Sequence, residues 1–259
     1  PLPRRVKPEG TMADNVRVVC RFRPQNKKEI ERGGKSIVEF KDVSTVRIVG
    51  PETGDHSFSF DRSFVPSVTQ QEVYELAALP AVQDTFKGYN GTVFVYGQTS
   101  SGKTHTMMGP DGGKGMDDPA LKGIIPRMAK TIFDQVESAD EHMEFLVKVS
   151  YIEIYMEKVR DLLDASKSNL AVRESKGKGI YVDGATEVYV SCEDEIFDVM
   201  RTGTNNRAVG ATNMNAESSR SHSIFVVKVQ QKDVRTNSVK HGKLYLVDLA
   251  GSEKVGKTG

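Results

Sequence analysis

The stretch 93–104 constrains this chain more than any other part of its sequence. A short apolar run precedes Gly97-x-x-x-x-Gly102-Lys103-Thr104, which is the spacing of a phosphate-binding loop. Glycines let the backbone wrap closely around phosphate groups, and successive N–H groups and a helix N-terminus then point at the anionic oxygens. The lysine can reach the outer phosphates, and the threonine hydroxyl can ligate Mg²⁺. An accidental glycine-rich turn is the alternative, but the apolar strand before the loop and the Lys-Thr pair at its end argue against it.

Composition limits what else the chain can be. It has 259 residues and a formal net charge of +1, which gives no indication of a nucleic-acid or membrane partner. No apolar run approaches the roughly 20 residues that a membrane-spanning helix needs. Cys20 and Cys192 lie far apart and near no other plausible metal ligands, so we expect reduced thiols in an intracellular protein. We therefore expect neither nucleic-acid binding nor membrane insertion.

The N-terminal segment differs in composition from the rest of the chain. Residues 1–11 are rich in proline and basic side chains and precede Met12. We expect them to be an artificial leader, with a natural flexible arm as the alternative. The remaining segment, 12–259, is long enough for one large α/β domain. Residues 25–62 are rich in turns, which predicts a small antiparallel patch rather than a second domain.

Strand and helix patterns alternate along the chain. Apolar runs, several of them alternating with polar residues, predict strands at 16–23, 37–40, 46–49, 57–60, 93–96, 144–155, 224–231 and 243–247. Helical spacing and capping residues predict helices that begin near residues 67, 102, 124 and 191. This alternation predicts an α/β fold with a P-loop NTPase-type central mixed sheet and helices on both faces. The ligand is expected at the carboxyl edge of the sheet.

Two of the predicted helices carry start signals of their own. Thr69 and Glu72 have the spacing of a capping box, and Pro80 predicts a kink or a restart within the helix that follows. Ser191 precedes three consecutive acidic residues, which suit the positive end of a helix dipole. Between these helices, residues 172–179 form a basic, glycine-containing segment that predicts the tip of a hairpin.

Two further stretches indicate what the phosphate loop senses. The first, 213–223, is polar, has little helical character and is rich in hydroxyl groups. The second, 244–253, is an apolar strand that ends in Asp248, with Gly251 three residues later. An aspartate at the strand end can lie near Mg²⁺, and a glycine N–H in a loop that moves can reach the γ-phosphate. Together with the loop they predict a sensor for the terminal phosphate of a nucleoside triphosphate.

These stretches, with the segment Cys20-Arg21-Phe22-Arg23-Pro24, resemble the kinesin motor domain. The family's phosphate loop, first switch and second switch correspond to residues 97–104, 215–222 and 248–253. The resemblance extends from about residue 15 to the last residue, and the four motifs occur in the family's order. The amino-acid sequences of 150–155 and 242–248 are most similar to those of conventional, cargo-transporting kinesins with an N-terminal motor. The resemblance implies that 12–259 is a partial motor domain whose C-terminal part is absent.

The resemblance implies a role for each residue of these motifs. The implied nucleotide-binding residues are Arg21, Arg23, Pro24, Gly97, Gln98, Thr99, Ser100, Ser101, Gly102, Lys103, Thr104 and His105. The implied catalytic residues are Asn215, Ser218, Ser219, Arg220, Gly251 and Glu253. The implied Mg²⁺ ligands are Thr104, Ser219 and Asp248.

Three of these roles belong to the second switch and its partner. The resemblance implies that the Gly251 N–H senses the γ-phosphate and that Glu253 helps relay a proton from the attacking water. It also implies that an ion pair between Arg220 and Glu253 closes the two switches. An exposed ion pair of little energetic consequence is the alternative for that pair. A simple turn serine is the alternative for Ser219.

The resemblance implies an ATPase that binds ATP or ADP with Mg²⁺ and couples hydrolysis to movement along microtubules. Tubulin would be contacted by basic residues of the predicted hairpin, namely Arg173, Lys176 and Lys178. The implied location is the cytoplasm, on the microtubule cytoskeleton. The full-length protein is expected to dimerise through regions outside this chain.

Three other functions are alternatives to a motor. A nucleotide-dependent microtubule-binding or regulatory module without motility is the main alternative, because the chain ends at Gly259, before the family's principal microtubule-binding helix and neck linker. A GTPase-like switch would share the loop, but the sequence has no guanine-specifying Asn-Lys-x-Asp stretch. A myosin-like motor is the third alternative, but the residues of the two switch segments do not fit it.

Overall fold

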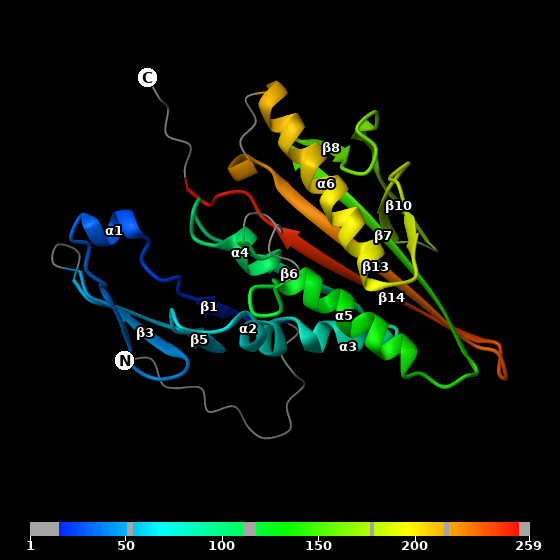
Figure 1. Cartoon of the computed structure of the whole chain (residues 1–259), viewed down its shortest axis with the longest axis horizontal. Coiled ribbons are helices and arrows are strands. Elements are labelled where there is room, and N and C mark those ends of the chain that lie inside the picture. The colour runs from blue at the N-terminus through cyan, green and yellow to red at the C-terminus, as the bar shows by residue number, and fades with distance from the viewer. Residues whose placement is uncertain (1–15, 51–53, 111–117, 177–178, 215–217, 254–259) are drawn as a thin grey trace. The chain divides into compact units, whose positions relative to one another are not determined.

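The computed structural model describes residues 16–50, 54–110, 118–176, 179–214 and 218–253. The chain divides into two compact units, Pro1–Val68 and Thr69–Gly259, and each is described by itself (Figure 1). No helix among these described ranges is long and apolar enough to cross a membrane.

The first unit consists of short strands and one short helix. Its elements are β1 (Val19–Arg21), α1 (Lys27–Glu31), β2 (Val38–Phe40), β3 (Thr45–Ile48), β4 (His56–Ser59) and β5 (Arg62–Phe64). Strands β2, β3 and β4 form an antiparallel sheet in that order, as predicted for this turn-rich region. Strand β1 is shorter than the predicted 16–23 and pairs with β5 in parallel.

Helix α1 was not predicted, although its start is encoded in the sequence. The Asn26 side chain accepts a hydrogen bond from the Glu29 N–H at 2.9 Å, and the Glu29 carboxylate accepts one from the Asn26 N–H at 2.8 Å. This reciprocal pair is a capping box, which satisfies two backbone donors at the helix start. The Asn-x-x-Glu spacing could have identified it.

The second unit is built on a seven-stranded mixed sheet. In spatial order its strands are β6 (Asn90–Val95), β14 (Ser238–Asp248), β13 (His222–Asp233), β7 (Met143–Tyr155), β8 (Lys158–Asp161) and β9 (Ser168–Leu170), with β12 (Val188–Val190) also paired to β7. Strands β6 and β14 are parallel, and the other pairs are antiparallel. The mixed central sheet that the sequence predicted is therefore confirmed.

Register brings the ends of three strands to one edge of this sheet. Val95, the last residue of β6, pairs with Asp248, the last residue of β14. Asp248 also pairs with Ser223, the second residue of the antiparallel strand β13. The segment after β6, the segment after β14 and the segment before β13 therefore leave the sheet at the same place.

The helices of the second unit are α2 (Gln70–Ala77), α3 (Leu79–Phe86), α4 (Lys103–Met107), α5 (Ile124–Glu137) and α6 (Glu193–Met214), followed by a 3-10 turn at Ser218–Arg220. The predicted capping box of Thr69 and Glu72 is present, and Pro80 lies in the first turn of α3, so the chain restarts a helix there. Helix α6 begins two residues after Ser191, close to its predicted start, and continues to Met214.

Helices α3 and α6 pack on the same face of the sheet, and the helices of the second unit lie across it in Figure 1. Leu246, Phe225 and Tyr151 are neighbours in register and are almost fully buried on this face. A Cβ at Gly203 of α6 would lie 2.1 Å from the Tyr151 ring, so only glycine lets this helix approach the sheet so closely.

A hairpin projects from the second unit at the basic segment noted in the sequence. Strands β10 (Val172–Ser175) and β11 (Gly179–Val182) pair in antiparallel fashion. The predicted hairpin is therefore present.

Candidate functional site

The phosphate loop follows β6 and adopts a backbone that depends on glycine. A Cβ at Gly97 would lie 2.6 Å from the Ser101 hydroxyl oxygen. Gly102 has φ +95°, a left-handed conformation that glycine adopts without steric cost, and α4 begins at the next residue. Ser100 is also left-handed, at φ +64°, which is uncommon for a residue with a side chain. The predicted loop and the predicted start of its helix are thus both present.

The lysine of the loop folds back on the loop itself. Lys103 Nζ donates to the carbonyl of Gly97 at 2.8 Å and to the carbonyl of Gln98 at 3.0 Å. An ammonium group has three donors, so these contacts occupy two of them. The amine therefore lies over the loop, where a phosphate oxygen could replace a carbonyl as its partner.

The end of β14 meets the start of α4 through two side chains that are 144 residues apart. Thr104 Oγ1 donates to Asp248 Oδ2 at 2.6 Å, and Asp248 is only 3% exposed. The other carboxylate oxygen, Oδ1, is buried and has no hydrogen-bond partner among the described residues. An unsatisfied buried carboxylate oxygen is costly, so this one suits a cation or a cation-bound water.

The donor set at this point fits Mg²⁺ bound together with a phosphate. Within the described ranges, no three His, Cys, Asp or Glu side chains gather closely enough to hold a metal by themselves. Mg²⁺ does not need such a cage, because it keeps several waters and is bound through one or two protein oxygens plus substrate phosphates. Thr104 and Asp248 supply oxygens of that kind.

A buried arginine that the sequence analysis missed connects this aspartate to the sheet. Arg207 of α6 is 9% exposed, and its Nη1 lies 4.0 Å from Asp248 Oδ2. Its Nε lies 3.3 Å from Glu153 Oε1 of β7, and its Nη2 donates to both the carbonyl and the hydroxyl of Ser221. Arg160 of β8 lies 3.9 Å from the second oxygen of Glu153.

The sequence holds a weak signal for this network. Glu153 lies between Ile152 and Ile154 in its strand, and Arg207 falls on the same face of α6 as the buried Met200. Charged residues at apolar positions are rarely buried unless they are paired. That pattern indicates a buried ion pair, although it does not identify the partners.

The two switch segments meet at the phosphate loop. The Gly251 N–H donates to the carbonyl of Ser219 at 2.7 Å, and the Ala250 N–H donates to His222 Nδ1 at 3.0 Å. The Ser252 N–H donates to the carbonyl of Gly97 at 3.1 Å. Three motifs that are far apart in the sequence therefore meet in one place among these described residues. In this conformation the Gly251 N–H is bound to Ser219.

The carboxylate of Glu253 contacts the phosphate loop. It accepts a hydrogen bond from the Thr99 N–H at 2.8 Å and another from the Thr99 hydroxyl. The hydroxyl contact is the main reason why the pKa of Glu253 is lowered, with backbone N–H groups and the charge of Lys103 acting in the same direction. A Cβ at Gly251 would lie 2.5 Å from both oxygens of this carboxylate, so the approach requires glycine there.

The predicted ion pair between Arg220 and Glu253 does not form in this conformation. Arg220 is exposed, and the described residues contain no contact between its guanidinium and Glu253. The physical reason is local, because the Thr99 N–H and hydroxyl already satisfy the carboxylate at short range.

Several predicted residues lie elsewhere or outside the described ranges. Asn215, Lys178 and the side chain of Ser218 are outside the described residues.

Arg21, Arg23 and Pro24 belong to the first unit, where Arg23 forms a bidentate ion pair with Glu29 at 2.5 and 2.8 Å. Their predicted contact with the nucleotide stays a prediction. His105 is exposed on α4, and Lys176 is exposed on the hairpin.

The hairpin arginine is not free. Arg173 Nε lies 2.7 Å from Asp183 Oδ2, and both side chains are at least half exposed. An ion pair so exposed contributes little to stability, so either partner can exchange at small cost. The hairpin therefore presents Lys176 and a weakly held arginine.

Comparisons with known proteins agree with this geometry. The family model described as Kinesin motor domain matches residues 21–259. Kinesin-related protein 3 of Dictyostelium discoideum is 57% identical over 246 residues, which cover 95% of this chain and 20% of that protein. Kinesin heavy chain of Syncephalastrum racemosum is 54% identical over 95% of this chain and 26% of its own length. The chain thus spans about a quarter or less of these relatives.

A solved structure shares the fold. Its title is "Structure of a fast kinesin: Implications for ATPase mechanism and interactions with microtubules". It superposes with a TM-score of 0.89 at 53% identity and covers 94% of this chain and 68% of its own. The α/β class and the central sheet flanked by helices are therefore confirmed.

Proposed function

Because this chain belongs to the kinesin motor domain family, we propose that it binds and hydrolyses ATP and couples hydrolysis to movement along microtubules. One observation carries the proposal. The segments that follow β6 and β14 and the segment that precedes β13 converge on the phosphate loop, through the bonds from Thr104 to Asp248 and from Gly251 to Ser219. A site of this kind can report the presence of a terminal phosphate to the rest of the protein.

Nucleotide binding rests on the loop backbone and on Lys103. The backbone N–H groups of Gln98 to Gly102 would receive the β- and γ-phosphates, and Lys103 would exchange its carbonyl partners for phosphate oxygens. Exchange of a neutral acceptor for a charged one strengthens a hydrogen bond, which favours the bound state. Thr99, Ser100 and Ser101 complete the loop.

Thr104, Ser219 and Asp248 are the residues that would hold Mg²⁺, which neutralises charge on the transferred phosphate when it is bound. The unsatisfied Oδ1 of Asp248 supports this assignment, because a metal-bound water can donate to it. Arg207 Nη1 lies 4.0 Å from Asp248 Oδ2 and helps to hold the carboxylate in place. With Mg²⁺ bound, Asp248 would accept hydrogen bonds from water, and Thr104 would supply its hydroxyl oxygen to the metal.

Hydrolysis requires Glu253 to leave Thr99. A released glutamate carboxylate is ionised near neutrality, so it can accept a proton from the attacking water. Once a γ-phosphate draws the Gly251 N–H away from Ser219, Glu253 would pair with Arg220 and close the two switches. Ser218 and Asn215 would contact the γ-phosphate and position the first switch.

The remaining contacts of the proposed motor lie outside this site. Arg21, Arg23, Pro24 and His105 would hold the adenine and ribose. The hairpin residues Arg173, Lys176 and Lys178 would meet the acidic surface of tubulin, and this attraction would weaken as salt rises. Such a motor would act in the cytoplasm on microtubules and would dimerise through other regions of a longer protein.

Three variants test the proposal at the site itself. Lys103→Ala and Thr104→Asn should abolish ATP binding or turnover, whereas Glu253→Ala should bind ATP with near-normal affinity and hydrolyse it at a small fraction of the normal rate. Equilibrium binding of a fluorescent ATP analogue and release of phosphate measure the two steps separately. Normal hydrolysis by Glu253→Ala would show that the second switch has been assigned wrongly.

A further inference from the structure

Helix α4 carries the lysine and threonine of the phosphate loop, yet it is too short to fix its own position. It spans only the five residues Lys103–Met107, and its N-cap residue Gly102 has no side chain to cap it. Isolated helices of this length are unstable in water, because nucleation is costly and few internal hydrogen bonds repay it. The position of Thr104 relative to Asp248 must therefore be set by contacts from outside the helix.

Gln70, the first residue of α2, makes such a contact. Its side chain is buried, with 5% of the residue exposed. Its Nε2 donates to the carbonyl of His105 at 2.8 Å and to the carbonyl of Leu121 at 3.2 Å, and it lies 3.4 Å from His105 Nδ1. A carboxamide nitrogen has two donors, so one side chain joins α4 to the segment 119–123.

The segment 119–123 lies directly against the C-terminal end of α4. The Gly123 N–H donates to the carbonyl of Met108 at 3.3 Å, and a Cβ at Gly123 would lie 2.6 Å from backbone atoms of Met107 and Met108. A Cβ at Gly109 would lie 2.9 Å from the Leu121 carbonyl oxygen. Backbone packing this close leaves little freedom, so movement of the segment would move α4.

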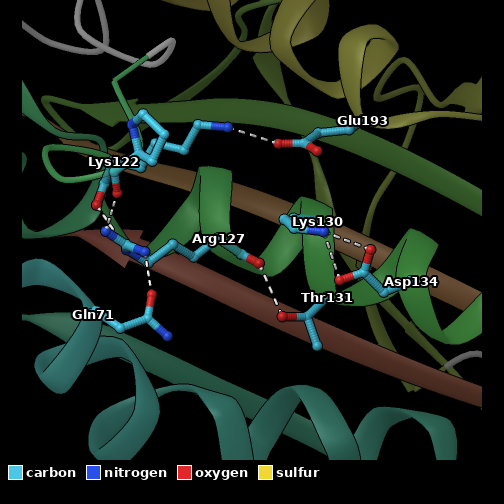
Figure 2. Close-up of polar contacts among 8 residues, drawn as sticks. Gln71, Lys122, Arg127, Lys130, Thr131, Asp134 and Glu193 are labelled. Atoms are coloured by element: carbon cyan, nitrogen blue, oxygen red, sulfur yellow. Dashed lines mark hydrogen bonds and ion pairs between the residues drawn. The ribbon is translucent and has the colours of Figure 1, made fainter.

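Two basic side chains hold this segment in place (Figure 2). Arg127 Nε donates to the carbonyl of Lys122 at 3.0 Å, its Nη2 donates to the carbonyl of Pro119 at 2.6 Å, and its Nη1 donates to the Gln71 side chain. Lys122 Nζ lies 3.0 Å from Glu193 Oε1 at the start of α6. The segment is thus anchored to α2, α5 and α6, and Gln70 transmits that anchorage to α4.

We propose that Gln70 is a positioning residue for the phosphate loop, which holds α4 in the orientation that binds nucleotide by joining the His105 carbonyl to the segment 119–123. The inference rests on the proposed nucleotide-binding function. Loss of the amide removes the donor that the His105 and Leu121 carbonyls share and lets α4 shift, so nucleotide must restore the orientation when it binds. The dissociation constant for MgADP should rise by about five- to twenty-fold.

Gln70→Met tests this inference, because methionine has nearly the same volume and no donor. Tyr74→Phe is the matched control, since it removes one hydrogen bond of the same helix, from Tyr74 to Thr131 at 2.6 Å, without touching α4. The measurements are the dissociation constant for MgADP and the KM and kcat for ATP, taken well below the melting temperature of each variant.

The inference predicts that Gln70→Met raises the dissociation constant and the KM, with kcat at saturating ATP within about twofold of normal. Tyr74→Phe should lower the melting temperature and leave both binding constants unchanged. A merely structural role for Gln70 would give the control pattern, and that result would overturn the inference while the proposed function stands. Failure of the unmodified chain to bind MgADP would overturn both. If Gln70→Met does not fold, Gln70→Glu replaces it, because its carboxylate also lacks donors and the same rise is expected.

Discussion

The buried arginine of α6 gives the sharpest test of how the site is held together. Replacement Arg207→Met keeps most of the side-chain volume and removes the charge. The side chains of Arg207, Glu153 and Asp248 are only 10%, 9% and 4% exposed, so two carboxylates would lose a buried partner. The hydroxyl and carbonyl of Ser221 would lose their donor as well.

The expected loss in unfolding free energy depends on which partners Glu153 and Asp248 retain. Breaking a buried ion pair from one side typically costs about 3–5 kcal/mol, because the charge left behind stays desolvated. Glu153 retains Arg160 at 3.9 Å, and Asp248 retains the Thr104 hydroxyl at 2.6 Å. These remaining partners place the expected loss near the lower end, at about 3 kcal/mol.

Urea denaturation at neutral pH measures this loss as a lower midpoint with an unchanged m value. Arg201→Met is the matched control, because Arg201 lies on the same helix and its ion pair with Asp198 is largely exposed. The control should change the unfolding free energy by less than about 1 kcal/mol. A loss of under about 1 kcal/mol for Arg207→Met as well would refute the argument that this network holds the site. If Arg207→Met does not fold, Arg207→Lys should show a smaller loss in the same direction.

Three further predictions concern packing, capping and pH. Gly203→Ala should lower the unfolding free energy by about 2 kcal/mol or more, because the alanine Cβ would overlap the Tyr151 ring. Calorimetry measures this loss, and an unchanged melting temperature would contradict the close packing. Thr69→Ala removes the capping box of α2 and should cost about 1 kcal/mol, measured by urea denaturation; no change would show that the cap contributes nothing. The pKa of Glu29 is lowered to about 2 by its arginine partner and the Asn26 N–H, so this contact is present at neutral pH and is lost only as pH falls through about 2. A carboxyl carbon titration by NMR with a midpoint near 4 would contradict it.

Local signals in the sequence predicted much of the fold. The loop spacing of Gly97 to Thr104 fixed the strand before it and the helix after it, because the motif works only in that setting. The capping box at Thr69 and the restart at Pro80 were predicted for the same reason, since each depends on residues a few positions apart.

Contacts between distant residues were harder to predict. The hydrogen bond from Thr99 to Glu253 spans 154 residues, whereas the family resemblance implied Arg220 as the partner of this carboxylate. Which one binds depends on the register of the strands and on the conformation of the switches, and neither can be read from spacing. The pairing of Arg207 with Glu153 and Asp248 was missed for the same reason, although the strands of Glu153 and Asp248 were predicted.

We propose that the phosphate loop and both switches form an ATPase that responds to microtubules. The most direct test is the steady-state rate of phosphate release from Mg-ATP by a protein that includes this chain, measured with and without microtubules at low salt. We expect a rate that rises many-fold with microtubules and falls again as salt screens the basic hairpin. ATP binding without any increase in turnover would contradict it and would favour a nucleotide-dependent module without motility.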